Sequence, residues 1–175
     1  MKLTNFDFTA PSDETDLILI VEGKKIHVGR QYLAVHSPVF SAMFYGNFVE
    51  KGKAEIELKD VKYEAFISLL QIIYPSGRIV LFDTVKPILA LADFYQIKFA
   101  RDQAESYLHH SEVIEFPEKI QLADQYKLKE LQHFCLQSFK TMKEIKDLHK
   151  DGHLDGLSND MQAALFRRMM ELPAE

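Results

Sequence analysis

The chain has 175 residues, of which 47% are hydrophobic, and a formal net charge of -5 at pH 7. This length and composition suit one medium domain, or one domain with a small helical extension. The acidic balance gives no general attraction to phosphate backbones, so we do not expect nucleic acid as a partner. No apolar run approaches the ~18 residues of a membrane span, so we do not expect a membrane partner either. The single cysteine, Cys135, excludes an internal disulfide, so we expect a reducing compartment and a cytoplasmic or nuclear location, or both.

The chain is predicted to begin with a linker and then a β-hairpin. Residues 1–15 are mostly polar, although Phe6 and Phe8 alternate in a way that also fits a short strand. The apolar run at 17–21 is typical of a strand buried on both faces, and a tight turn separates it from a second strand at 25–28.

Helical spacing of apolar residues begins after the hairpin. Ser37 followed by Pro38 fits the N-cap and first position of a helix. Residues 54–58 alternate as a half-buried strand does, and the apolar positions of 66–73 and 85–92 recur at the helical period. Together these patterns predict an α+β domain that ends near Ser111.

The remainder of the chain is predicted to be entirely helical. Helical patterns cover 118–139, 141–150 and 158–170. Within the first of these, Leu122-Ala123-Asp124-Gln125-Tyr126-Lys127-Leu128 echoes the earlier Leu91-Ala92-Asp93-Phe94-Tyr95-Gln96-Ile97. With only two copies, a true repeat and a chance recurrence of helix-packing residues both remain open as explanations.

No motif for catalysis or for binding a metal or cofactor is found. Gly23-Lys24-Lys25 lacks the upstream glycine of a phosphate loop, and the adjacent His109 and His110 would point in different directions on a helix. Residues 149–155 lack the spacing of a calcium loop, and Cys135 falls on an apolar helical stripe. We therefore expect no catalytic residue, no cofactor, no metal and no enzyme activity.

The stretch Leu33-Ala34-Val35-His36-Ser37-Pro38-Val39-Phe40, continued to Phe44, resembles the Leu-Ala-x-x-Ser-x-x-Phe-x-x-x-Phe pattern of the BTB/POZ domain. The resemblance extends through 55–61, through Ile73-Tyr74-Pro75 and through 91–95, and is greatest to the BTB half of MATH-BTB proteins. It implies a BTB/POZ domain at 16–110, with a small mixed sheet flanked by helices. A C-terminal helical extension at 111–175, similar to a 3-box or a shortened BACK domain, would follow it.

The resemblance also implies a homodimer built from the first strand and the first two helices. Relatives commonly have Ala-His-Lys where this chain has Val28-Gly29-Arg30, so the corner at Gly29 departs from the family pattern. Asp16 and Arg30 match a charged pair near this interface in relatives, and an ordinary surface pair remains the alternative. The residues expected at the dimer interface are Asp16, Leu17, Arg30, Tyr32, Leu33, Val35 and Met43.

A second implied surface surrounds Phe48-Val49-Glu50, which matches the hydrophobic-x-Glu motif of cullin-binding BTB domains. An aromatic anchor beside a carboxylate suits a binding hot spot, whereas the alternative is that Phe48 covers the core beneath its own loop. In relatives a groove in the 3-box helices adds apolar contact with cullin-3. Here Ile120, Leu122, Leu128 and Leu131 could line it, although the pattern favours core packing of the same helices for most of them. The residues expected to bind cullin are Tyr45, Asn47, Phe48, Val49, Glu50 and Tyr95.

These implications predict an adaptor. The expected function is a homodimeric BTB subunit that binds the N-terminal domain of cullin-3 and recruits an unknown substrate protein to a cullin-3 RING ubiquitin ligase. The alternative is a BTB oligomerisation or transcriptional scaffold that does not bind cullin. Residues 1–15 are too short for a MATH domain, so the substrate receptor would belong to a longer chain, to another surface or to a dimer partner.

Overall fold

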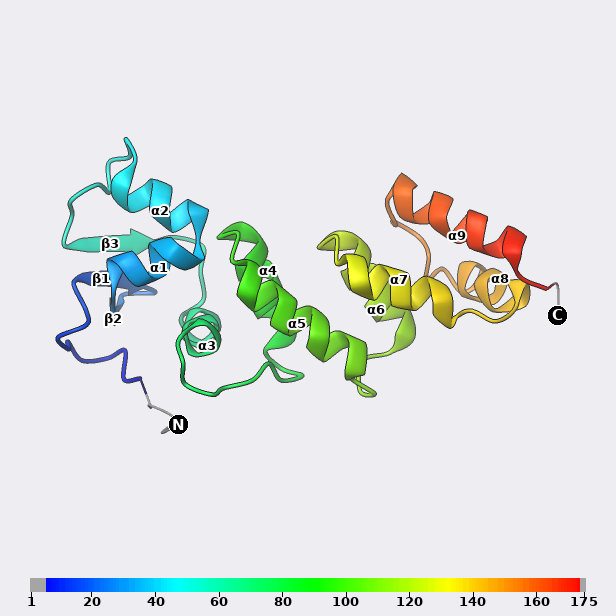
Figure 1. The fold of residues 1–175 in the computed structure, drawn as a ribbon, viewed down its shortest axis with the longest axis horizontal. Helices are drawn as coiled ribbons and strands as arrows, with labels where there is room; N and C mark the ends of the chain where they lie inside the picture. The colour runs from blue at the N-terminus through cyan, green and yellow to red at the C-terminus, as the bar shows by residue number, and fades with distance from the viewer. Residues whose placement is uncertain (1–5, 174–175) are drawn as a thin grey trace. The chain divides into compact units, whose positions relative to one another are not determined.

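The computed structural model describes residues 6–173, which form two compact units divided between Ala104 and Glu105 (Figure 1). The division falls inside one helix, whereas the predicted end of the first domain is residue 110, the last residue of that helix. The first unit contains β1 (Leu17–Val21), β2 (Lys24–Val28), α1 (Arg30–His36), α2 (Pro38–Tyr45), β3 (Glu55–Leu58), α3 (Tyr63–Ile73), α4 (Val85–Phe94) and the start of α5 (Lys98–His110). The second contains the end of α5 and then α6 (Phe116–Gln125), α7 (Lys129–Ser138), α8 (Met142–Lys150) and α9 (Asn159–Glu171).

The described sheet has three strands in the order β2-β1-β3. β1 pairs antiparallel with β2, so that Leu19 faces Ile26, and parallel with β3, so that Leu19 faces Ile56. The turn between β1 and β2 has positive φ at Glu22 (49°) and Gly23 (75°), as a two-residue hairpin turn requires. Burial alternates along β1, and Ile18 and Ile20 are only half-buried. The prediction of a strand buried on both faces is therefore wrong.

An aromatic cluster forms the centre of the first unit. Phe40 of α2 stacks on Phe44, with ring centroids 5.5 Å apart, and on Tyr95, at 4.4 Å, while Phe66 of α3 meets the Tyr95 ring edge-on. Ser37 is the N-cap of α2, as the sequence predicted: its Oγ accepts the Phe40 N–H at 3.0 Å and donates to the Tyr95 carbonyl at 2.5 Å. The cap thus connects the start of α2 to the end of α4.

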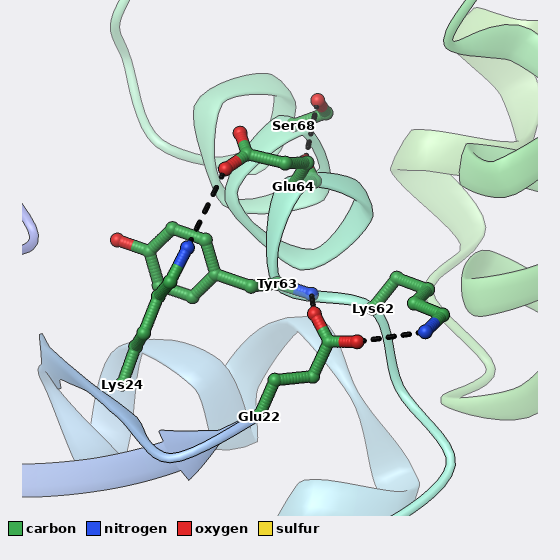
Figure 2. A network of polar contacts seen from close by, with 6 residues as sticks. All are labelled: Glu22, Lys24, Lys62, Tyr63, Glu64 and Ser68. Carbon is green, nitrogen blue, oxygen red and sulfur yellow. Dashed lines mark hydrogen bonds and ion pairs between the residues drawn. The ribbon is translucent and has the colours of Figure 1, made fainter.

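The hairpin turn is joined to the start of α3 by polar contacts. Figure 2 shows the Glu22 carboxylate accepting the Tyr63 N–H at 2.9 Å and a Lys62 Nζ hydrogen bond at 2.8 Å. Lys62 occupies the N-cap of α3 without a side-chain cap bond, so Glu22 satisfies a free helix N–H from a neighbouring element. The bond from Lys62, followed by that from Tyr63, holds the pKa of Glu22 below its usual value. Lys24 adds a cation–π contact, 4.2 Å from the Tyr63 ring centroid.

The segment before β1 lies against the sheet, and its described part, residues 6–16, contains no strand. The His27 N–H donates to the Phe8 carbonyl at 2.8 Å, and the buried Phe8 ring meets Tyr74 edge-on at 5.0 Å. A Cβ added at Gly29 would lie 2.9 Å from the Glu14 carbonyl oxygen. Glycine stands at this corner because the N-terminal segment passes too close for a side chain. The remaining predicted residues of the linker, 1–5, lie outside the described part of the chain.

The second unit is built from helical pairs. α6 packs on α7, and α9 contacts both α7 and α8. Core packing, the interpretation that the sequence favoured over a cullin groove, is what the structure shows for four side chains, each at most 7% exposed: Ile120, Leu122, Leu128 and Leu131. Across the described residues, no helix combines the length and the apolar character needed to span a bilayer.

Candidate functional site

The loop after α2 presents the hydrophobic-x-Glu residues. The helix ends at Gly46, whose N–H donates to the Ala42 carbonyl at 2.8 Å, and a Cβ there would lie only 2.4 Å from that oxygen. Two further bonds, from Lys51 N–H to the Phe48 carbonyl and from Lys53 N–H to the Glu50 carbonyl, fold the loop into consecutive turns. These turns leave the Phe48 side chain 59% exposed. The alternative, in which Phe48 covers the core, is not what the structure shows.

Phe48 and Glu50 line one groove of about 440 Å³ with residues of α2. Its walls are largely apolar, and a carboxylate at one position supplies a fixed charge. An exposed aromatic ring beside such a hollow suits a protein partner that inserts an apolar side chain and a hydrogen-bond donor. The remaining lining residues are Pro38, Val39, Ala42, Met43 and Gln96.

The other predicted cullin-binding residues divide into exposed and buried groups. Tyr45, Asn47 and Val49 are exposed on the end of α2 and its loop. Tyr95, by contrast, is 2% exposed in the aromatic cluster, and burial raises the pKa of its phenol to about 12. Its side chain cannot reach a partner, so assigning Tyr95 to the binding surface is wrong.

Sequence reasoning missed Gln96, which lies in the groove that Phe48 and Glu50 line. Gln96 has a positive φ of 53° in the turn after α4, and its side chain is exposed. One signal in the sequence could have indicated Gln96: it directly follows Tyr95, the last residue of the Leu-Ala-Asp-x-Tyr motif. Met43, predicted at the dimer interface, also lines this groove.

The predicted dimer residues differ in how much surface they offer. Leu17 and Leu33 are at most 2% exposed within their own chain, so their side chains belong to the monomer core and their assignment to a subunit interface is wrong. Tyr32 is half-buried and donates from its hydroxyl to the Ile73 carbonyl at 2.7 Å. Val35 is 76% exposed on α1 and is the predicted dimer residue most available to a second copy.

Asp16 and Arg30 interact within the chain. The Asp16 carboxylate accepts the backbone N–H of Arg30 at 2.7 Å, and the Arg30 Nε lies 3.9 Å from its other oxygen. The Arg30 guanidinium also donates to the Lys53 carbonyl at 2.7 Å. Arg30 therefore connects the start of α1 to the loop that carries the hydrophobic-x-Glu residues.

The structure adds two observations on chemistry. Among the described residues, no three His, Cys, Asp or Glu side chains gather as a metal ion would need. Cys135 is buried in the second unit, and burial raises the pKa of its thiol to about 11. At neutral pH it is therefore an unreactive thiol.

The sheet, the capped α2 and the loop that follows define a BTB/POZ domain, and the family model for this domain matches residues 7–112. The chain belongs to the BTB/POZ family. It is 37% identical over 168 residues to BTB and MATH domain-containing protein 38 of Caenorhabditis elegans, covering 95% of this chain and 43% of that protein.

Two further relatives extend this comparison. BTB and MATH domain-containing protein 36 of Caenorhabditis elegans is 34% identical over 166 residues, covering 94% of this chain and 52% of that protein. Kelch-like protein 28 of Mus musculus is 34% identical over 93 residues, covering 53% of this chain and 16% of that protein. The chain spans about half the length of the BTB and MATH domain-containing relatives.

Proposed function

We propose that the chain is a protein-interaction adaptor that binds the N-terminal domain of cullin-3 through the groove beside Phe48 and Glu50. BTB/POZ family membership and the names of the relatives support the adaptor role. The observation that carries the cullin assignment is that the exposed Phe48 and the carboxylate of Glu50 line one groove at the end of α2. Catalysis of ubiquitin transfer would belong to other subunits of the ligase.

The geometry suits a hot spot of modest size. Phe48 provides apolar area, Met43 gives the groove an adaptable wall, and Glu50 favours a partner that brings a cation or hydroxyl. A homodimer, with Val35 of α1 among its contacts, would place two such grooves in one assembly and raise the effective concentration of bound substrate near the ligase. The helical second unit would serve as the 3-box-like extension.

The test is binding of purified cullin-3 N-terminal domain to the parent chain and to a Phe48→Ala, Glu50→Ala double variant. We expect the double variant to bind at least about 30-fold more weakly, because it removes a hot-spot ring and its neighbouring charge. Phe82→Ala, Asp83→Ala is the matched control, since it removes an exposed ring and a neighbouring exposed carboxylate from a different loop of the same unit.

Light scattering of the same samples separates the outcomes. A parent dimer that shifts to the mass of two chains plus two cullin domains supports the adaptor. Normal cullin binding by the double variant would contradict the assigned site. A parent dimer that ignores cullin would favour the scaffold alternative, and a parent monomer would contradict the proposed dimer.

A further inference from the structure

Arg30, the first residue of α1, contacts both ends of the loop that follows α2. Its Cζ lies 5.7 Å from the ring centroid of Phe44, in the last turn of α2, and its Nη2 donates to the Lys53 carbonyl at 2.7 Å. The loop begins at Gly46, the C-cap of α2, and Lys53 lies two residues before β3. One planar guanidinium therefore fixes the separation between the two ends of this loop.

The Arg30 guanidinium is itself held firmly. Its side chain is 13% exposed, and Asp16 accepts the Arg30 N–H through one carboxylate oxygen while the other lies 3.9 Å from Nε. Phe44, which the guanidinium faces, is 1% exposed and stacks on Phe40. A guanidinium presents several N–H donors in one rigid plane and stacks on a ring at the same time, which a lysine ammonium cannot do. Arg30 thus ties the end of the loop to the core of the first unit.

The anchor at Lys53 reaches the hydrophobic-x-Glu residues through the backbone. The Lys53 N–H donates to the Glu50 carbonyl, and the Lys51 N–H donates to the Phe48 carbonyl, both at 3.1 Å. Lys53 therefore accepts from Arg30 and donates to the backbone of Glu50. Because the Phe48 side chain is mostly exposed, core packing does not fix it, and its direction depends on the path of the loop. A loop without its anchor samples more conformations.

We propose that Arg30 is a positioning residue, which holds residues 46–53 in the conformation that presents Phe48 and Glu50 on one groove. The proposal rests on the proposed function, because it concerns the same groove. Loss of the guanidinium would lower the fraction of chains in the presenting conformation, and the apparent dissociation constant for a partner rises by the inverse of that fraction. Arg30 would thereby affect binding without touching the partner.

Two variants of the full 175-residue chain test this role. Arg30→Met keeps the apolar stem and removes every donor, whereas Arg30→Lys keeps the charge and replaces the fork by a single ammonium. NMR order parameters of the backbone amides of 47–53 measure the order of the loop. Calorimetry with purified cullin-3 N-terminal domain measures the dissociation constant per site, which does not depend on whether the chain is a dimer.

We expect Arg30→Met to lower the order parameters of the loop from about 0.85 to below about 0.6, while those of α3 stay near about 0.85. Cullin should then bind about tenfold more weakly, as it would if the presenting conformation fell to about one tenth of the population. Arg30→Lys should lie between the parent and Arg30→Met in both measurements, with binding about threefold weaker, because an ammonium replaces only part of the fork.

Arg78→Met is the matched control, because Arg78 is an exposed arginine in a different loop of the same unit. It should keep the parental order parameters and the parental affinity. Thermal unfolding shows whether each variant is folded. If Arg30→Met is not, Arg30→Lys alone decides the outcome.

Four results would overturn the proposal. The first is a loop in Arg30→Met that is as ordered as in the parent, and the second is a loosened loop that still binds cullin as the parent does. The third is parental behaviour of Arg30→Lys, since charge alone would then suffice. The fourth is an equal change in Arg78→Met. A parent chain that does not bind cullin would contradict the proposed function instead, and the order parameters would then decide the role of Arg30.

Discussion

The chain contains two copies of one turn, the first between α4 and α5 and the second between α6 and α7. In the first, the Ile97 N–H donates to the Ala92 carbonyl at 2.8 Å and Gln96 has φ 53°. In the second, the Leu128 N–H donates to the Ala123 carbonyl at 2.9 Å and Lys127 has φ 51°. Both are Schellman caps with a residue other than glycine in the left-handed position. The echo in the sequence therefore corresponds to a shared local structure.

The side chains of the two turns nevertheless have different roles. Tyr95 is buried against Phe40, whereas Tyr126 is half-buried. Asp93 is exposed, whereas the Asp124 carboxylate accepts the Ser158 N–H at 2.6 Å and the Ser158 hydroxyl at 2.5 Å. The short motif therefore determines the path of the backbone, while elements distant in sequence determine what each side chain does.

The tyrosine pair should show the largest difference between the turns. Tyr95→Ala should lower the free energy of unfolding by about 3–5 kcal/mol, because it leaves a cavity beside Phe40. Tyr126→Ala should cost about 1–2 kcal/mol, since less of its ring is buried. Urea unfolding followed by circular dichroism measures both.

Phe94→Ala is the control for this pair, because the adjacent ring is 67% exposed and its loss should change the free energy by less than about 0.5 kcal/mol. A Tyr95→Ala chain that keeps its stability and loses only cullin binding would contradict the core assignment and restore Tyr95 to the docking surface.

Most of the fold could be predicted from the sequence because its signals are local. The hairpin at 17–28, the Ser37 cap and the helical stripes each depend on residues a few positions apart, and the structure confirms them. The role of Gly29 could not be predicted, because the Glu14 carbonyl that excludes a side chain belongs to a polar linker whose sequence does not reveal where it packs.

The candidate site was predicted less completely than the fold, because it depends on contacts between residues that are distant in sequence. The family resemblance drew attention to Phe48 and Glu50, and the structure places both on one groove at the end of α2, while their role in cullin binding stays a prediction. It misplaced Tyr95, because a motif position does not reveal that Phe40 and Phe66 surround the ring. An amphipathic stripe looks the same whether it lines a groove or a core, so the sequence could only favour core packing of Leu128 and Leu131, which the structure shows.

The aspartate pair should give the next largest difference. Asp124→Ala should cost about 1–2 kcal/mol, because it leaves the N–H and hydroxyl of Ser158, the N-cap of α9, without their acceptor. Asp93→Ala should change stability by less than about 0.5 kcal/mol, because the exposed carboxylate it removes accepts no bond in the described structure. Thermal unfolding of the two variants measures the difference, and equal effects would mean that the link from Asp124 to Ser158 contributes nothing.

The smallest effect should be the one that the two turns share. Gln96→Gly and Lys127→Gly should each raise the free energy of unfolding by roughly 0.5–1 kcal/mol. Glycine adopts positive φ without strain, and the strain that is relieved exceeds the extra conformational entropy that glycine loses on folding. Urea titration should give similar gains in both variants. Only Gln96→Gly should also weaken cullin binding, since Gln96 lines the groove beside Phe48 and Lys127 belongs to the other unit. A loss of stability in either variant would show that its side chain makes contacts worth more than the strain of its backbone.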